Sequence, residues 1–430
     1  MGLALPSSIL IYTFVKSGKI LILGGGFGGV RTALDLERAL GPSADITLID
    51  RNSYHLFLPL LYEVASAFGV RRDPYSLKLR KTISIPYADI FQGKHIHFVQ
   101  ADITRVDLEH REVQTASGTA YSYDYLVIGL GSESADFGIP GVKAYAYQFK
   151  TIDDALMLNR RLAEVFEEAS RGERTLPIRI LVGGAGFTGV ELAAELACCA
   201  KNFAAQCGLG RRCFTIALLE GGPKILPGIS ERERSLIVRR LTKLGVGVLE
   251  HTRIQDVLSD SIKLTDGRTM KGDIVLWTAG VEAHRFLRTI ANLGLTDRGK
   301  IIVDEYLNVV NHENVFAVGD NIEFIDHRNQ RPEPALAYVA VDHGKVAAKN
   351  IRRSIHGKER IPHKPFYDVW VAPVGGKYAV AHLWWNISIP GFLGWFIRQL
   401  VDFRYFLSVL PFKRALQLFT QEVEIFRHND

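Results

Sequence analysis

The sequence predicts an α/β fold with two Rossmann-like dinucleotide-binding domains, and two observations lead to this prediction. An apolar strand pattern runs twice into Gly-x-Gly-x-x-Gly and then into a helical pattern, at residues 19–29 and 179–189. Each turn is followed by a strand that ends in an acidic residue, Asp50 and Glu220. In this motif the first glycine makes the tight turn, the second lets a pyrophosphate approach, and the third lets the helix pack on the strand. One match is a weak signal, but two on one chain predict two dinucleotides, a flavin and a nicotinamide that exchange electrons.

The two acidic residues support this interpretation to different degrees. Asp50 lies 21 residues after Gly29, the distance at which a carboxylate accepts a hydrogen bond from a ribose hydroxyl. A solvated carboxylate at the end of a strand is the alternative. Glu220 lies 31 residues after Gly189, because residues 201–212 read as a helix extension and loop. A carboxylate here favours NAD over NADP, although two neighbouring arginines, Arg211 and Arg212, favour the opposite.

The remaining pattern divides the chain into four segments. A strand at 125–128 leads into Gly129 and Gly131, and a strand at 314–320 ends in Asp320, at the sheet edge where ligands bind in such folds. A helical pattern from residue 151 marks entry into an inserted domain, which the chain leaves through residues 273–280. We therefore predict a discontinuous FAD-binding domain at 19–150 and 273–350, an NAD(H)-binding domain at 151–272, and a C-terminal segment at 351–430.

Composition excludes several classes of protein. Charged residues at 23% and apolar residues at 47% over 430 residues fit an ordinary globular chain, and a net charge of +6 does not indicate nucleic acid binding. All four cysteines lie between Cys198 and Cys213, with no zinc or CxxC redox spacing, so we expect no metal and no disulfide relay beside a flavin. The apolar run at residues 9–15 is too short to span a bilayer and lacks the features of a signal peptide.

The C-terminal segment predicts two aromatic-rich amphipathic helices separated by Pro411. Charges interrupt the apolar run, so we do not expect it to cross a membrane, but four basic residues flank its aromatic positions. Such helices fit the interface of a membrane surface. Packing on the protein's own core or on a second subunit is the alternative. The basic residues are Arg398, Arg404, Lys413 and Arg414.

Taken together, these motifs resemble a known family. The two glycine turns, the stretch Phe-Leu-Pro-Leu-Leu-Tyr-Glu-Val-Ala at 57–65, Trp-Thr-Ala-Gly at 277–280 and Val-Gly-Asp at 318–320 look like those of type II NADH dehydrogenases. These are single-subunit, non-proton-pumping NADH:quinone oxidoreductases. The resemblance covers roughly residues 19–420, and the 57–65 stretch is its most family-specific part.

The resemblance implies cofactors, partners and site residues. It implies FAD and NAD(H) as cofactors, a quinone as acceptor, peripheral attachment to the cytoplasmic face of the cell membrane, and a homodimer as one possibility. Glu191, Tyr338 and Lys377 are the catalytic candidates. The residues expected to bind FAD are Gly24, Gly26, Phe27, Gly28, Gly29, Asp50, Arg51, Pro59, Leu60, Ile103, Gly129, Gly131, Asp320, Ala337 and Tyr338. The residues expected to bind NAD(H) are Gly184, Gly186, Phe187, Thr188, Gly189, Glu191, Glu220 and Gly280. The alternative for Glu191 is that it has no catalytic role and is simply a carboxylate near the helix N-terminus, where the helix dipole stabilises a negative charge.

Two departures from the family pattern concern the acceptor site. Tyr338 and Asp342 stand where the family carries the glutamines of Ala-Gln-x-x-x-Gln, and Lys377 precedes Ala-Val one place early. These departures keep two alternatives open: a flavin reductase with ferredoxin or oxygen as acceptor, and a flavin-binding redox sensor with little turnover. A sulfide:quinone oxidoreductase is disfavoured, because it needs cysteines near the flavin.

Overall fold

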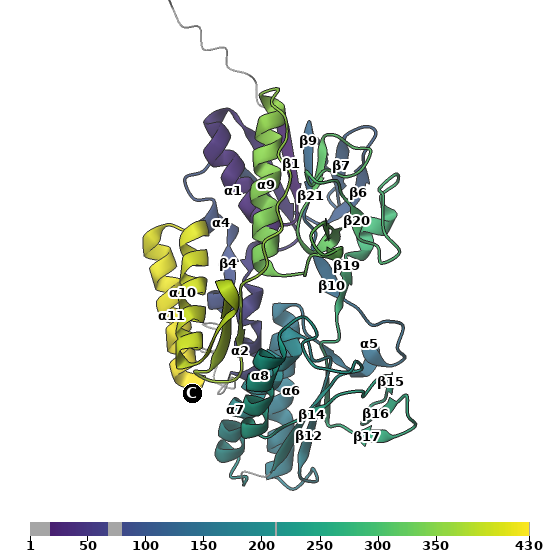
Figure 1. The fold of residues 1–430 in the computed structure, drawn as a ribbon, viewed down its shortest axis with the longest axis vertical. Helices are drawn as coiled ribbons and strands as arrows, with labels where there is room; N and C mark the ends of the chain where they lie inside the picture. The colour runs from purple at the N-terminus through teal and green to yellow at the C-terminus, as the bar shows by residue number, and fades with distance from the viewer. Residues whose placement is uncertain (1–17, 68–79, 211–212, 430) are drawn as a thin grey trace, which may run out of the picture.

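The structure is a computed structural model that describes residues 18–67, 80–210 and 213–429, so the apolar run at 9–15 lies outside it. Two α/β units stack along the long axis, and a pair of C-terminal helices lies to one side (Figure 1). The predicted α/β fold with two parallel sheets is confirmed.

The first unit is built on a parallel five-stranded sheet in the order β21-β9-β1-β2-β5. Its central strands are almost continuously buried, because helices cover one face of the sheet and residues of the antiparallel strands β6 (Ile103–Asp107) and β7 (Glu112–Thr115) pack against the other. Helices α1 (Phe27–Leu40) and α9 (Ala337–Ile355) pack against each other over this sheet (Figure 1). The strands are β1 (Lys19–Leu23), β2 (Asp45–Asp50), β5 (Ile96–Gln100), β9 (Tyr125–Ile128) and β21 (Val315–Ala317).

The second unit repeats this plan with the sheet order β11-β18-β12-β13-β14. Its helices are α6 (Ile152–Ser170), α7 (Phe187–Gln206) and α8 (Glu231–Leu244). Helices α6 and α8 begin with complete capping boxes, at Thr151 with Asp154 and at Ser230 with Glu233, which explains where they start. The strands are β11 (Tyr147–Gln148), β12 (Ile178–Gly183), β13 (Phe214–Leu219), β14 (Val246–Leu249) and β18 (Ile274–Trp277).

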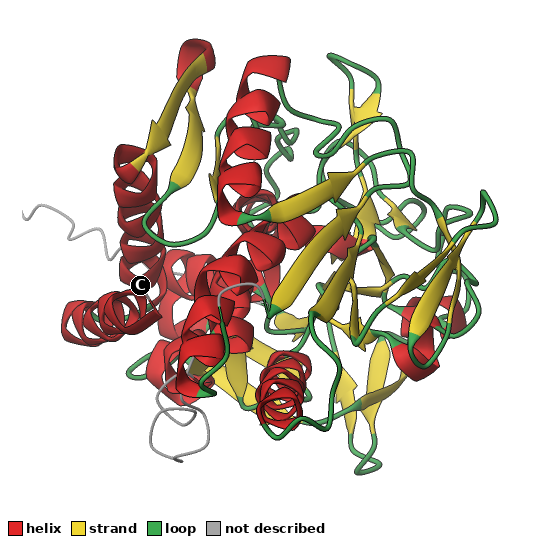
Figure 2. Cartoon of the chain, turned by 90° about the horizontal axis from the view of Figure 1, so that it is seen from below, coloured by secondary structure: helices red, strands yellow, loops and turns green. Residues whose placement is uncertain are grey.

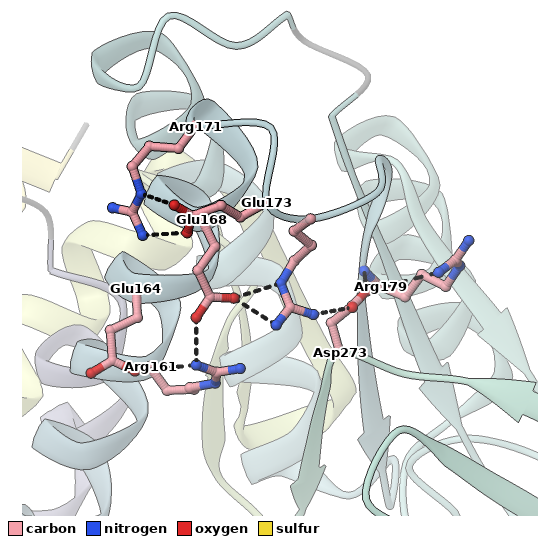
Figure 3. Close-up of polar contacts among 8 residues, drawn as sticks. Arg161, Glu164, Glu168, Arg171, Glu173, Arg179 and Asp273 are labelled. Carbon is pink, nitrogen blue, oxygen red and sulfur yellow. Dashed lines mark hydrogen bonds and ion pairs between the residues drawn. The ribbon is translucent and has the colours of Figure 1, made fainter.

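The predicted boundaries of the inserted domain, 151 and 272, are wrong by one strand at each end. Strand β18 pairs with β11 and β12, so the second sheet takes in residues 147–277. A polar network fixes this strand to the unit: Arg174 contacts Glu168 Oε2 at 2.6 Å and Asp273 Oδ1 at 2.5 Å, and Asp273 Oδ2 accepts from the Arg179 amide at 2.8 Å (Figure 3). The sequence alone could not assign β18 to the second sheet, because buried apolar strands of the two sheets have the same residue pattern.

Smaller antiparallel sheets complete both units. One lies within the first unit, one within the second, and the pair β10 and β19 lies where the chain passes between the units. The strands of these sheets are β6 (Ile103–Asp107), β7 (Glu112–Thr115), β8 (Ala120–Ser122), β15 (Ile254–Val257), β16 (Ser261–Leu264), β17 (Thr269–Lys271), β10 (Ser132–Ser134) and β19 (Val281–Ala283). The shorter elements include β3 (Tyr54–Leu56), α2 (Leu61–Ser66), β4 (Ser84–Pro86), α4 (Tyr87–Ile90), α5 (Val142–Tyr145), β20 (Ile301–Ile302), β22 (Ile322–Glu323), β23 (Ile325–Asp326) and β24 (Arg331–Pro332).

The C-terminal segment forms an antiparallel sheet followed by a helical hairpin (Figures 1 and 2). Strands β25 (Trp370–Pro373), β26 (Ala379–Leu383) and β27 (Ile387–Gly391) lead into α10 (Phe392–Val409) and α11 (Phe412–Asn429). The two predicted helices are thus present, separated at Pro411, whereas the three strands were not predicted. Among the described residues, no helix is long and apolar enough to cross a bilayer.

Candidate active site with two dinucleotide-binding turns

The first glycine turn joins β1 to α1 in a conformation that only glycine tolerates well. Gly24 has a φ of +94°, and a Cβ there would lie 2.3 Å from the Gly129 carbonyl oxygen. A Cβ at Gly29 would lie 1.9 Å from the Gly24 carbonyl oxygen, and one at Gly28 would lie 2.8 Å from Val318 Cγ2. These glycines therefore let the helix and the neighbouring strands approach one another.

Asp50 closes this turn at the end of β2. Its Oδ2 accepts from the Gly25 amide at 2.6 Å, and its Oδ1 accepts from the Asn52 amide at 2.7 Å. Burial raises the pKa of the Asp50 carboxyl, while these two amides oppose that effect. The carboxylate is thus fixed beside the turn, at the place where a ribose hydroxyl would be bound.

A buried aromatic cluster, not predicted from the sequence, supports the same turn from outside. The Gly25 carbonyl accepts from Tyr87 Oη at 2.8 Å and from His55 Nδ1 at 2.9 Å, and His55 Nε2 accepts from Tyr405 Oη of α10 at 2.8 Å. Because a carbonyl can only accept, His55 carries its proton on Nδ1. Burial lowers the pKa of His55 to about 4, so the ring is neutral. Phe27 packs edge-on against this ring at 4.8 Å.

The second turn joins β12 to α7 and has the same geometry as the first. Gly184 has a φ of +105°, and a Cβ there would lie 2.3 Å from Ala279 Cα. A Cβ at Gly189 would lie 1.9 Å from the Gly184 carbonyl oxygen. Glu220 Oε2 accepts from the Ala185 amide at 3.1 Å, as Asp50 does from Gly25, and its Oε1 accepts from the Gly222 amide at 2.7 Å.

Both turns leave space where a pyrophosphate would lie. Gly26 and Gly186 cap α1 and α7, both are exposed, and a Cβ at either would meet no protein atom within 4 Å. The first amides of α1 and α7 are available there to an anion. The residues present therefore fit one dinucleotide at each turn. Beside the second turn, Thr188 is exposed and Phe187 packs on Trp370 at 5.4 Å.

The other residues expected to bind cofactors lie around these turns. Gly131, with a φ of +73°, donates from its amide to Asn321 Oδ1 at 2.9 Å. Asp320 Oδ2 accepts from Ser132 Oγ at 2.7 Å. Arg51 is exposed and contacts His284 Nε2 at 2.6 Å. Of the remaining residues, Leu60 is buried, Ile103 begins β6, Ala337 begins α9, and Gly280 has a φ of +153° beside Phe137.

Glu191 lies one turn into α7, close to the buried guanidinium of Arg398. Burial raises the pKa of Glu191 to about 8, although the positive charge of Arg398 lowers it and the negative charge of Asp402 raises it further. Arg398 also donates from Nη2 to the Pro59 carbonyl at 2.9 Å. The structure thus brings the 57–65 stretch, Glu191 and α10 together.

Tyr338 and Lys377 lie in different surroundings. Tyr338 is half-buried on α9, its hydroxyl has no hydrogen-bond partner among the described residues, and burial raises its pKa. Lys377 is exposed in the turn between β25 and β26. That turn contacts α7, because the Gly376 amide donates to Glu195 Oε2 at 3.2 Å, one helical turn beyond Glu191. The roles of these two residues stay predictions.

A buried His-Glu-His cluster lies beneath the Gly-Asp turn. Glu333 Oε2 accepts from His343 Nε2 at 2.8 Å and from His363 Nε2 at 3.0 Å. Such a set of groups is able to bind a metal ion in principle. However, the Gly319 amide donates to His343 Nδ1 at 3.2 Å, so the proton of the neutral ring is on Nε2. A protonated Nε2 donates a hydrogen bond and does not ligate a metal, so we interpret the cluster as a brace for the Gly319 turn.

We expect Glu333→Gln to destabilise the protein by about 2–3 kcal/mol at neutral pH, because a charged acceptor of two buried N–H groups is lost. Burial alone would raise the pKa of Glu333, but the two histidines hold it at about 2. The stabilisation is therefore complete above the ordinary pKa of 4.5 and is lost as the pH falls towards 2. Denaturant unfolding across this range, with the exposed Glu359→Gln as control, measures it. An equal stability of Glu333→Gln and wild type at neutral pH would contradict the assignment.

Two complete dinucleotide sites on one chain define the class of protein, a two-dinucleotide oxidoreductase. The sequence pattern of the pyridine nucleotide-disulphide oxidoreductase family matches residues 18–344. The chain belongs to this family.

Individual relatives resemble the chain over nearly its whole length. The Type II NADH:quinone oxidoreductase of Staphylococcus haemolyticus (strain JCSC1435) is 29% identical over 407 residues, which cover 92% of this chain and 98% of that protein. Its counterpart in Staphylococcus aureus (strain NCTC 8325) gives the same values. Among solved structures, NDH2 from Plasmodium falciparum in complex with NADH has a TM-score of 0.82 at 20% identity, covering 95% of this chain and 98% of that one. The sulfide:quinone oxidoreductase of Aquifex aeolicus has a TM-score of 0.75 at 19% identity, covering 90% of each chain.

Proposed function

We propose that this protein is an FAD-dependent NADH:quinone oxidoreductase that works at a membrane surface without spanning it. The observation that carries the proposal is the presence of two glycine turns, each with a carboxylate that accepts from a backbone amide of the turn, in a chain similar to such an enzyme over 92% of its length. FAD belongs at the Gly24–Gly29 turn and NAD(H) at the Gly184–Gly189 turn.

We assign two roles to the residues of the site: binding of the two nucleotides and supply of a proton. When bound, FAD accepts a hydride from NADH and passes two electrons to the acceptor. The turn amides and Asp50 hold one nucleotide, and the turn amides and Glu220 hold the other. The overall balance is NADH plus a proton plus quinone giving NAD⁺ and quinol, so one proton comes from the medium. Glu191, protonated below a pH of about 8, is suited to hold that proton.

The membrane part of the proposal is supported by the inverted character of α10. The buried side of this helix carries Arg398, Gln399 and Asp402 beside Phe406 and Val409, whereas all its exposed side chains except Arg404 are apolar. A helix that exposes this many apolar side chains favours contact with an apolar environment. The exposed apolar residues of this region are Trp384, Trp385, Ile387, Phe392, Leu393, Phe396, Leu400, Val401, Leu407, Phe412 and Leu416.

We define these eleven residues as the apolar face. Arg404 and Lys413 are exposed among them and would meet anionic lipid headgroups. Trp385 stands 89% exposed in the turn between β26 and β27, which is unfavourable in water and typical of an interfacial anchor. A membrane occupant fits these observations, and a second copy of the chain on the same face is the alternative. Attachment to the cytoplasmic side of a bacterial-type membrane is part of the same proposal.

Other acceptors are the competing candidates. Tyr338 and Asp342 replace the glutamines expected near a quinone, which favours a reductase with ferredoxin or oxygen as acceptor. The apolar face argues against a freely soluble acceptor. A sulfide:quinone oxidoreductase, although similar in fold, is disfavoured because all four cysteines lie at 198–213, on α7 and the segment that follows it.

We expect quinone-dependent NADH oxidation to decline as the pH rises through about 8, because the Glu191 carboxyl then loses the proton that it donates. Glu191→Gln should remove this alkaline limb and lower quinone turnover by about 10²-fold. Steady-state rates across the pH range measure both effects, and ferricyanide, which takes electrons without protons, is the control acceptor. An unchanged alkaline limb in Glu191→Gln would assign the titration to another group.

A further inference from the structure

The helical hairpin α10–α11 carries a buried acidic pair that the proposed reaction has not yet used. Asp402 on α10 and Glu422 on α11 are each about 1% exposed, and their carboxyl groups lie close enough for each to influence the pKa of the other. The rings of Phe403 on α10 and Phe419 on α11 also contact each other across the hairpin, with centroids 4.7 Å apart. The pair is therefore buried where α10 and α11 pack together.

The hydrogen bonds of the pair require a proton. Asp402 Oδ1 is paired with the guanidinium of Arg398, but no donor in the described part of the chain reaches Asp402 Oδ2 or either oxygen of Glu422. Two ionised carboxylates offer only acceptors to each other. A single proton on Glu422 turns this repulsive contact into a hydrogen bond to Asp402, and burial raises the pKa of Glu422 well above its ordinary range.

The charges around the pair also indicate that at least one of these carboxyl groups is protonated. Arg398 is the buried cation that acts on three carboxyl groups: Asp402, Glu422 and Glu191. One positive charge cannot compensate three buried negative charges, so some of these acids remain protonated at neutral pH. The titratable and charged groups that face the cluster are Tyr62 and Glu63 on α2, Glu191 and Glu195 on α7, Arg398 and Asp402 on α10, and Glu422 on α11.

Arg398 connects this pair to the candidate active site. Its Nη2 holds the Pro59 carbonyl in the 57–65 stretch, while its Nη1 pairs with Asp402. A change in the charge of Asp402 therefore acts directly on the Arg398 guanidinium, whose positive charge lowers the pKa of Glu191. Asp402 raises and Arg398 lowers the pKa of Glu191, so the two groups oppose each other there.

We propose that Asp402 and Glu422 form a proton-storing pair that, through Arg398, keeps Glu191 protonated and so supplies the one proton that quinone reduction takes from the protein. This inference rests on the proposed function. The electrons and the first hydrogen come from NADH. The second proton leaves the O–H of the Glu191 carboxyl for the quinol oxygen, and the Glu191 carboxylate takes a proton back from the medium. Asp402 and Glu422 do not touch the quinone in this proposal; they act on Glu191 through Arg398 and are therefore positioning residues.

The test combines infrared spectroscopy with the two half-reactions of the FAD-loaded, full-length protein. In a Glu191→Gln background, which removes the C=O stretch of the Glu191 carboxyl, the protein should still show the C=O stretch of a second protonated, buried carboxyl group at neutral pH, shifted in D₂O. Adding Glu422→Gln should abolish this second band. Rapid-mixing experiments should show flavin reduction by NADH unchanged in Glu422→Gln. Reoxidation by a water-soluble ubiquinone analogue should slow by about 10²-fold. The exposed neighbour Glu424→Gln is the matched control.

A second variant separates a proton-linked role from a structural one. Asp402→Asn removes the negative charge that raises the pKa of Glu191, so the alkaline limb of quinone turnover should move to lower pH. A merely structural role would lower stability without moving this limb. The proposal is overturned if the second infrared band survives when Glu422→Gln is added to Glu191→Gln, or if both Glu422→Gln and Asp402→Asn reoxidise and titrate as wild type does. If wild-type flavin is not reoxidised by quinone at all, the proposed function fails instead, while the infrared band still reports on the pair.

Discussion

Gly186→Val is expected to abolish the use of NADH while leaving the fold and the bound FAD intact. The side chain would fill the space above the α7 N-terminus where the pyrophosphate would lie, and its Cβ would meet no protein atom within 4 Å. Reduction of the flavin by NADH should fall on the order of 10³-fold or more, because positioning the nicotinamide contributes roughly 7–11 kcal/mol to such a step. Anaerobic rapid mixing with NADH, monitored at the flavin absorbance, measures it.

The repeated architecture provides matched controls for this variant. Gly26→Val places the same side chain in the equivalent space of the first turn, so it should lose FAD and still bind NADH. Gly189→Val should fail to fold, because its Cβ would lie 1.9 Å from the Gly184 carbonyl oxygen. If Gly186→Val showed normal turnover and normal affinity for NADH, the second glycine turn would not be part of the NADH-binding site.

Replacing three aromatic residues of the apolar face should release the protein from membranes. Trp385, Phe392 and Phe412 are 89%, 58% and 64% exposed, and burying each such side chain contributes roughly 1.5–3 kcal/mol. The triple serine variant should therefore lower the partition coefficient onto anionic vesicles by about 10³-fold or more. Vesicle sedimentation measures the bound fraction, with ferricyanide reduction by NADH as the test that the active site is intact.

The control for this experiment replaces apolar residues that are also exposed but lie elsewhere. Tyr145, Met157 and Val310 are 50%, 50% and 40% exposed. Their triple serine variant should bind vesicles as wild type does. Equal binding by both triple variants would argue against the apolar face as the docking surface, and a shift from dimer to monomer in the aromatic variant alone would assign the face to a second copy of the chain.

Much of the fold could be predicted because its signals are local. The glycine turns need particular residues at fixed spacing, and both turns place their strand-end carboxylate on an amide of the turn. Strand β18 was assigned to the wrong domain because a buried parallel strand shows no periodicity that identifies its partner. The strands at 370–391 were not predicted, because only the helical pattern that follows residue 390 was considered in the C-terminal segment.

The candidate site was harder to predict where it depends on contacts between distant residues. His55, Tyr87 and Tyr405 support Gly25 from three separate elements, and no spacing in the sequence links them. The charges of α10 were interpreted as flanks of an amphipathic helix, yet Arg398 and Asp402 are buried. Their spacing of four residues was visible, but only the fold shows that this side of the helix faces the protein and that Glu422 joins it.

The central claim is tested most directly by following NADH oxidation by the FAD-loaded protein with and without a soluble quinone analogue, beside a one-electron dye. The account predicts rapid oxidation with quinone, little without an acceptor, and a preference for NADH over NADPH because of Glu220. Rapid reduction of the dye without any reoxidation of the flavin by quinone would contradict this prediction. NADH would then be confirmed as the electron donor and FAD as the cofactor, but the physiological acceptor would be a molecule other than quinone.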